Sequence, residues 1–208
     1  MKIEYLLKTA NILFKHRINA SRLDQLPNNC IPCNSDEAYE IQNRLKNIYL
    51  SLKDNILIGK KVGCTNKWAQ EQININEPFY GNIFSKYSAS SGCSLSSKKF
   101  SEPYLEPEFS FRIKEDIDIS QAPFNLKQVI NLVDTVMGSI EIVDFRFNKK
   151  LKDIGINNLI ATNGCSEYWI KSKKEFKINK INLNDHSVKV YINDRLIEKG
   201  NSSNVLNN

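Results

Sequence analysis

Glu106 and Glu108, separated by a proline, stand in the apolar segment 104–113. Side chains two residues apart on a β-strand point to the same face, so both carboxylates would lie on one side of a sheet. Two carboxylates that close repel each other unless a cation lies between them. A third carboxylate, Glu141, interrupts the apolar stretch 138–143, where a glutamate is rarely buried without a partner. The competing interpretation is that all three glutamates face solvent on a one-sided sheet.

Three glutamate oxygens suit a hard cation such as Mg²⁺ or Mn²⁺ better than they suit zinc. An octahedral ion held by three protein oxygens would keep about three positions open. Two of these positions could chelate a 2-oxo acid through its carboxylate and keto oxygens. The pattern therefore predicts a divalent-metal enzyme that acts on a small 2-oxo acid.

Lys60 and Lys61 are adjacent in the predicted strand 55–64, so alternation lets only one of them face inward. A lysine that faces three carboxylates and a dication would balance the remaining negative charge, and it could transfer a proton. The alternative is that both lysines cover an exposed sheet edge.

The elements that must position these residues follow from hydrophobic periodicity and turn signals. We expect helices over 6–14, 38–52 (with Ser35 as N-cap), 66–73 and 125–136, and strands over 55–64, 104–113, 138–145, 165–170, 188–192 and 195–198. We expect loops over 76–81 and 88–97, and irregular structure over 158–164. Pro107 predicts that its strand lies at a sheet edge or contains a bulge. Helices that precede strands indicate an α+β fold with a mixed sheet or a rolled barrel.

Composition and charge argue against several classes of protein. The chain has 208 residues and a net charge of +6, but its lysines are scattered and match no nucleic-acid motif. The densest run, 171–180, reads as a solvated surface with Trp169 nearby. Five cysteines, with the Cys30–Cys33 pair in a Pro/Asn loop, predict free thiols. We find no signal peptide and no apolar segment of about 20 residues, so we predict a cytoplasmic protein with no membrane or nucleic-acid partner.

Six motifs, in this order, resemble the fumarylacetoacetase superfamily and, within it, the 2-keto-4-pentenoate hydratase branch. They are DEAYEIQ (36–42), GKKVGCT (59–65), EPFYG (77–81), EPE (106–108), EIVD (141–144) and NG (163–164). A Glu-x-Glu pair alone is a weak signal. The ordered set, which spans nearly the whole chain, is fairly strong.

The resemblance implies Glu106, Glu108 and Glu141 as ligands of Mg²⁺ or Mn²⁺, Lys61 as a catalytic lysine, and Asn163 and Gly164 as substrate-binding residues. It implies an N-terminal helical segment (1–54) and a β-roll catalytic domain (55–208) of the fumarylacetoacetase C-terminal-domain type. It also implies a homo-oligomeric hydro-lyase of aromatic-compound catabolism. Such an enzyme adds water to a 2-hydroxy-2,4-dienoate and forms a 4-hydroxy-2-oxo acid.

The chain departs from the branch in three places. The loop 158–162 lacks the aspartate that the branch usually offers, and Pro107 is an unusual middle residue for the Glu-x-Glu pair. The sequence ends at Asn208, where relatives continue, so we expect a β-roll that is incomplete at its C-terminal end, with exposed apolar surface around the 188–197 hairpin.

Four other functions stay open. Two are enzymes of the same superfamily, a decarboxylase of a related 2-oxo diacid and an acylpyruvate hydrolase. The hydrolases use a lid histidine, whereas the lid-like stretch 66–77 has Glu71 and Glu77 and no histidine. The third is a truncated, non-catalytic remnant, and the fourth is a basic nucleic-acid-binding module.

Overall fold

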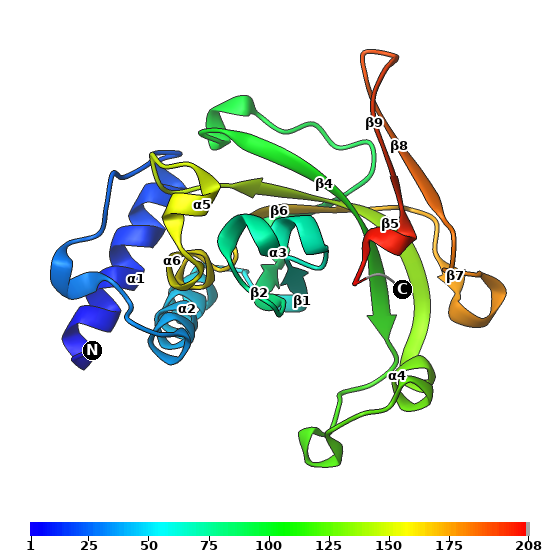
Figure 1. The fold of residues 1–208 in the computed structure, drawn as a ribbon, viewed down its shortest axis with the longest axis horizontal. Helices are drawn as coiled ribbons and strands as arrows, with labels where there is room; N and C mark the ends of the chain where they lie inside the picture. Colours follow the sequence, from blue (N-terminus) through cyan, green and yellow to red (C-terminus); the bar gives the residue numbers. More distant parts are fainter. Residues whose placement is uncertain (207–208) are drawn as a thin grey trace.

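The computed structural model describes residues 1–206 and contains N-terminal helices followed by mixed sheets (Figure 1). The α+β class is therefore confirmed. Helices α1 (Ile3–Ile18) and α2 (Ser35–Leu50) lie side by side at one end of the molecule. The buried faces of these helices repeat every three to four residues, as amphipathic helices require. They consist of Leu6, Ala10 and Leu13 on α1, and Ala38, Ile41, Leu45 and Tyr49 on α2.

The N-cap of helix α2 lies one residue before the position that we expected. Asn34 is the N-cap, and its side chain accepts a hydrogen bond of 2.9 Å from the Glu37 N–H. The prediction of Ser35 as the cap is therefore wrong. The backbone of Asn34 is extended, which lets its short side chain reach the free amides of the first turn.

The strand that carries Lys61, β1 (Leu57–Gly63), pairs antiparallel with β2 (Phe79–Phe84). Helix α3 (Lys67–Ile73) connects them and is capped by Asn66. Both β1 and α3 were predicted. The prediction of a loop over 76–81 is wrong for its last three residues. Strand β2 begins at Phe79, directly after Pro78, and pairing with β1 makes this segment a strand.

The larger sheet is mixed and has the strand order β3-β6-β5-β4. Its strands are β3 (Ser88–Ser90), β4 (Pro103–Ile113), β5 (Val133–Asp144) and β6 (Ser166–Lys171), and β7 (Phe176–Lys177) pairs with the first part of β5. Strand β5 is antiparallel to both of its neighbours, β4 and β6, whereas β3 and β6 are parallel. Because β4 is an edge strand, Pro107 can lie in it without a ladder donor, as predicted.

Three local predictions are wrong for tertiary reasons. Helix α4 (Leu126–Leu132) stops short of 136, because β5 begins at Val133 and pairs with β4. The segment 158–164, expected to be irregular, begins within α6 (Ile156–Ala161), which follows α5 (Leu151–Ile154) and buries Leu159 and Ile160. The expected loop 88–97 begins with β3, a strand only because β6 lies beside it.

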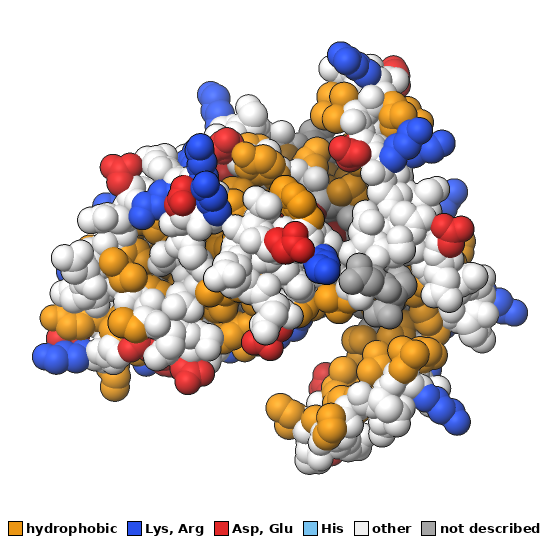
Figure 2. Space-filling model, in the orientation of Figure 1, with side chains coloured by type: hydrophobic (Ala, Val, Ile, Leu, Met, Phe, Trp, Pro, Cys, Tyr) orange, Lys and Arg blue, Asp and Glu red, His pale blue; other side chains and the backbone are white. Residues whose placement is uncertain are grey.

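The last strands, β8 (Ser187–Ile192) and β9 (Arg195–Asn201), form a separate hairpin that projects from the body (Figure 1). Its turn residues Asn193 and Asp194 both have positive φ, of 48° and 62°, as the turn prediction requires. Tyr191 and Ile197 are more than half exposed on this hairpin, and Figure 2 shows hydrophobic side chains there and over α4. Short 3-10 helices occupy Asn28–Cys30, Ser85–Tyr87, Ser97–Lys99, Ile119–Gln121, Ile178–Lys180 and Ser202–Asn204.

The hydrophobic core joins the N-terminal helices to β2, α6 and the end of β5. Its members include Leu13, Ile41, Phe84, Val143 and Ile160. All five cysteines are free, as predicted. Within residues 1–206, no helix combines the length and the hydrophobicity that crossing a membrane requires.

A buried ion network ties α1 to the larger sheet. Arg17 on α1 donates from Nε to Glu167 on β6 at 2.9 Å, and Arg146 donates to the same carboxylate at 2.5 Å. Arg146 also donates to Asp144 at the end of β5, at 2.8 Å. Each buried charge therefore has a partner of opposite sign, which is the condition for burying it at low cost.

Candidate metal centre

The three predicted glutamates lie on one face of the larger sheet. Glu106 and Glu108 come from β4, and Glu141 is the direct register partner of Glu106 on β5. One carboxylate oxygen from each lies within 4.8 Å of those of the other two. Glu141 is only 2 % exposed, so the interpretation in which all three glutamates face solvent is wrong.

The chemistry of this cluster fits a hard divalent cation. Neither carboxylate oxygen of Glu141 has a hydrogen-bond partner, although one of them makes an ion-pair contact with Lys61. Buried polar atoms are normally hydrogen-bonded, and a buried charge needs a compensating group. A cation held by three carboxylates would supply that compensation, and an all-oxygen donor set favours Mg²⁺ or Mn²⁺.

Burial and mutual repulsion perturb the two glutamates of β4. Burial and then the negative charge of Glu141 raise the pKa of Glu108 to about 8. Burial of the carboxyl group also raises the pKa of Glu106, although Glu106 as a whole residue is exposed, at the rim of the cluster. The site thus favours protons on Glu106 and Glu108 when no cation is bound, and a cation would displace them.

Lys61 reaches the cluster from the smaller sheet. It is 6 % exposed, and its Nζ lies 3.1 Å from Glu141 Oε2 and donates to the Gly164 carbonyl at 3.3 Å. Burial by itself would lower the Lys61 pKa, but the charges of the three glutamates, Glu141 above all, outweigh it and raise the pKa above its ordinary value. Lys61 is therefore an ammonium group at neutral pH.

Lys60 points the other way, as strand alternation requires. Lys60 is an exposed residue, and its Nζ donates a hydrogen bond to Asn82 Oδ1 at 2.6 Å. The interpretation in which both lysines cover an exposed edge is wrong, because Lys61 is buried.

Two glycines make room for the Lys61 side chain. A Cβ atom on Gly81 would lie 2.6 Å from the Asn163 carbonyl oxygen and 3.2 Å from Lys61 Cδ. Gly164 has a φ of +63°, in the left-handed region that glycine adopts at no steric cost. Larger residues at these positions would displace either the lysine or the loop that accepts its hydrogen bond.

Asn163 and Gly164 lie beside the cluster, but the Asn163 side chain bonds within the protein. Its Oδ1 accepts hydrogen bonds from the Asn82 N–H at 2.7 Å and from Asn82 Nδ2 at 3.0 Å. Its Nδ2 donates to the Asn82 carbonyl at 2.9 Å. Gln42 on α2 extends this buried amide network by accepting from Asn82 Nδ2 at 3.2 Å. The network fixes the loop that presents the Gly164 carbonyl to Lys61.

Asp144 belongs to the EIVD motif but lies outside the cluster. Its carboxylate accepts hydrogen bonds from the Ser101 N–H at 2.7 Å and from the Glu102 N–H at 2.9 Å. These amides directly precede β4, so Asp144 anchors the start of the strand that carries Glu106.

Two neighbours of the cluster were not predicted from the sequence. Trp169 on β6 is the register partner of Glu141, and Ser139 on β5 is the register partner of Glu108. Both residues therefore lie on the sheet face that carries the three glutamates. We had placed Trp169 beside a solvated lysine run. Alternation within 165–170 separates the two faces of that strand, but it does not say which one meets the glutamates.

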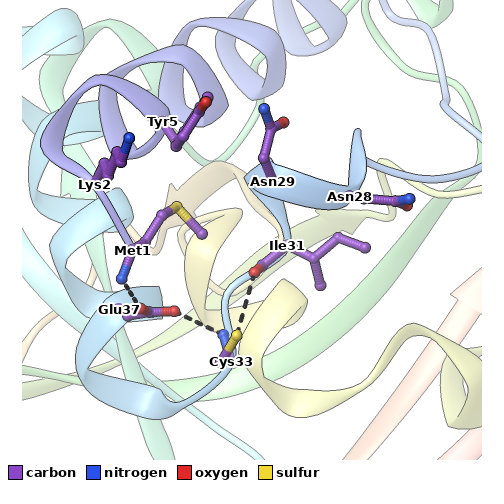
Figure 3. Close-up of a pocket in the computed structure, with 8 residues that line it drawn as sticks. All are labelled: Met1, Lys2, Tyr5, Asn28, Asn29, Ile31, Cys33 and Glu37. Carbon is purple, nitrogen blue, oxygen red and sulfur yellow. Dashed lines mark hydrogen bonds and ion pairs between the residues drawn. The ribbon is translucent and has the colours of Figure 1, made fainter.

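One surface pocket lies apart from these residues. It has a volume of about 220 Å³ and is lined by Met1, Lys2, Tyr5, Asn28, Asn29, Ile31, Cys33 and Glu37 (Figure 3). The Glu37 carboxylate pairs with the N-terminal ammonium and accepts a hydrogen bond from the Cys33 N–H at 2.8 Å. None of the three clustered glutamates lines this pocket.

Comparisons with known proteins agree with this geometry. No family model matches the sequence. The chain is 23 % identical over 167 residues to 2-keto-4-pentenoate hydratase 1 of Dechloromonas aromatica, covering 80 % of this chain and 61 % of that protein. It is 23 % identical over 175 residues to 4-oxalocrotonate decarboxylase of Pseudomonas sp. strain CF600, covering 82 % and 62 %.

Its fold matches that of 4-oxalocrotonate decarboxylase from Pseudomonas putida G7, solved with magnesium and adipate, with a TM-score of 0.88. That alignment has 21 % identity and covers 99 % of this chain and 76 % of the other. The chain spans about three fifths of the length of the curated relatives named above. Together these similarities confirm the resemblance of the chain to 2-keto-4-pentenoate hydratases and 4-oxalocrotonate decarboxylases, and the chain is shorter than those relatives.

Proposed function

We propose that Glu106, Glu108 and Glu141 hold one Mg²⁺ or Mn²⁺ ion, and that the chain is a hydratase of a small 2-hydroxy-2,4-dienoate. The product would be a 4-hydroxy-2-oxo acid. The observation that carries the proposal is the convergence of three carboxylates, one of them buried without hydrogen bonds, on the ammonium group of Lys61.

The charges of these groups are complementary to a dication. Three carboxylates and one ammonium leave a net charge of −2, which a divalent ion neutralises. When bound, such an ion would stabilise negative charge on the 2-oxo acid and orient it.

Lys61 has the position and the charge to act on the substrate. Its Nζ is held between Glu141 and the Gly164 carbonyl, so the ammonium group has a defined location. Because its pKa is raised, it would hold a proton for delivery to a dienolate carbon or oxygen rather than act as a base.

A decarboxylase of a 2-oxo diacid is the second candidate. It is favoured by the fold similarity to 4-oxalocrotonate decarboxylase and by sequence similarity to a protein of that name. Both reactions would use the same cluster, and they differ in whether the substrate carries a second carboxylate.

The test supplies purified protein with 2-hydroxypenta-2,4-dienoate, with and without Mg²⁺, and follows loss of dienoate absorbance. We expect Mg²⁺-dependent loss in the wild type and none in Glu108→Gln. A parallel assay with 2-oxohex-3-enedioate measures release of carbon dioxide. Absence of turnover in both assays, with Mg²⁺ bound, would contradict the enzymatic proposal.

We also propose that the protein is a homo-oligomer. The β8–β9 hairpin exposes Tyr191, Ile192 and Ile197, each at least half exposed, and large apolar patches are unusual on soluble monomers. The molar mass in solution, measured by light scattering, should exceed that of one chain. A well-behaved monomer would contradict this part of the proposal.

A further inference from the structure

The face of the larger sheet that carries the glutamates continues into a row of hydrogen-bonded side chains. Trp169 Nε1 donates to Ser110 Oγ at 3.1 Å, and Ser110 Oγ lies 2.7 Å from Ser139 Oγ. Trp169 is opposite Glu141 in register, and Ser139 is opposite Glu108. The indole therefore extends from β6 across β5 toward β4, beside two of the three carboxylates.

The hydrogen bonds determine what this indole offers to a ligand. Indole has a single donor and no acceptor, and Ser110 takes that donor. Ser139 is 7 % exposed and shares a hydrogen bond with Ser110. With these polar groups engaged, a half-buried Trp169 presents only aromatic surface to the space above the sheet.

The cationic side chains farther along this face already interact with a carboxylate of the protein. Arg112 donates from Nε to Glu175 at 3.0 Å, and Thr135 Oγ1 donates to the same carboxylate at 2.7 Å. Lys171, two residues beyond Trp169, also interacts electrostatically with Glu175. A carboxylate at the far end of a ligand would therefore compete with Glu175 for these cations.

We propose that Trp169 is the apolar wall of the substrate site and selects a 2-oxo acid whose tail is an uncharged hydrocarbon. Burial of such a tail against the ring gains the hydrophobic and dispersion energy of an aromatic contact. A terminal carboxylate would lose water there without gaining a free cation. This inference rests on the proposed function, because it assumes that the 2-oxo acid head lies at the three glutamates.

The chain offers a direct optical test. It contains two tryptophans, and Trp68 on α3 is 66 % exposed, so Trp68→Phe leaves Trp169 as the single indole. In this background, with Mg²⁺ saturating by calorimetry, Trp169 emission is titrated with two six-carbon probes. These are 2-oxohexanoate and 2-oxohexanedioate, which differ only at the tail. We expect 2-oxohexanoate to change the Trp169 emission and to bind about 10-fold more tightly than 2-oxohexanedioate. This ratio corresponds to a difference of about 1.4 kcal/mol in binding free energy.

Substitutions at Trp169 give the matched controls, with ligand binding measured by calorimetry. Trp169→Phe should keep the preference for the monoacid, Trp169→Ala should reduce it, and Trp169→Lys should reverse it. Retained Mg²⁺ binding in each variant reports that the cluster is intact, and the Trp68→Phe titration tests the inference even if a Trp169 variant does not fold.

The outcomes separate this inference from the function on which it rests. Equal or tighter binding of the diacid, or binding of the monoacid without any change in Trp169 emission, would overturn the inference and leave the metal site standing. Failure of the protein to bind Mg²⁺ would overturn both.

Discussion

Lys61 Nζ and Glu141 Oε2 lie 3.1 Å apart, although their strands belong to different sheets. Glu141 is in the five-stranded sheet, and Lys61 is in the β1–β2 pair. Both side chains are less than a tenth exposed, so this contact joins the two sheets at the cluster. A change at either residue should therefore affect both metal binding and the stability of the protein without metal.

Removal of one carboxylate should abolish high-affinity metal binding. We expect Glu108→Gln to weaken Mg²⁺ binding, measured by calorimetry, by more than about 100-fold, beyond the range that changes outside the ligand shell produce. Glu115→Gln, at an exposed position just after β4, is the control and should leave the affinity unchanged. Equal affinities in the two variants would refute the assignment of Glu108 as a ligand.

Removal of the lysine should separate binding from turnover. We expect Lys61→Met to bind Mg²⁺ at least as tightly as the wild type, because a positive charge has left the cluster. Turnover of the dienoate should fall by about 100-fold or more, as for loss of a proton-transfer group. Lys60→Met should resemble the wild type in both measurements. The opposite pattern in the two variants would show that the wrong lysine has been assigned.

Metal affinity should depend on pH through Glu108. Because its pKa is raised to about 8, a cation must displace a proton from it below that pH. We expect the apparent Mg²⁺ affinity to rise by up to about 10-fold per pH unit until pH 8 and to level off above it. Calorimetry at several pH values in buffers of different ionisation enthalpy would also count the released proton. A pH-independent affinity between pH 6 and 8 would contradict the proposed coupling.

The same shift predicts how stability without metal depends on pH. The pKa of Glu108 in the folded protein lies above its ordinary value of 4.5, so the protonated form favours folding. This contribution is complete below about pH 4.5 and is lost as the pH rises through 8. We expect chelator-treated protein to show this loss in denaturant unfolding, relative to Glu108→Gln, which has no such proton. Saturating Mg²⁺ should remove the effect.

The amide pair between Asn163 and Asn82 should be sensitive to a single atom. Asn163→Asp replaces the donor Nδ2 with an oxygen, so the buried Asn82 carbonyl loses its partner and meets another acceptor. We expect a loss of about 2 to 3 kcal/mol in the free energy of unfolding, typical of an unsatisfied buried group. Asn184→Asp, at an exposed loop position, should change stability little. Wild-type stability in Asn163→Asp would mean that this network does not hold the loop.

Local sequence patterns correctly predicted those features that depend only on nearby residues. The apolar face of α1, the Asn193–Asp194 turn and the edge position of Pro107 each depend on a few neighbouring residues. The prediction failed where a distant strand decided the outcome. Val133 and its successors become strand because β4 pairs with them, and Ser88–Ser90 becomes strand because β6 does.

The sequence by itself determined the residue types of the candidate site: three carboxylates for a hard cation and two adjacent lysines, of which alternation allows only one to face inward. The tertiary structure decided how they meet. It paired Glu106 with Glu141 across two strands, brought Lys61 from another sheet and placed Trp169 on the same face. Period-2 alternation states which side chains share a face of one strand. Which faces of separate strands come together depends on strand register and on packing between sheets. Both involve residues far apart in the sequence, so a local pattern does not determine them.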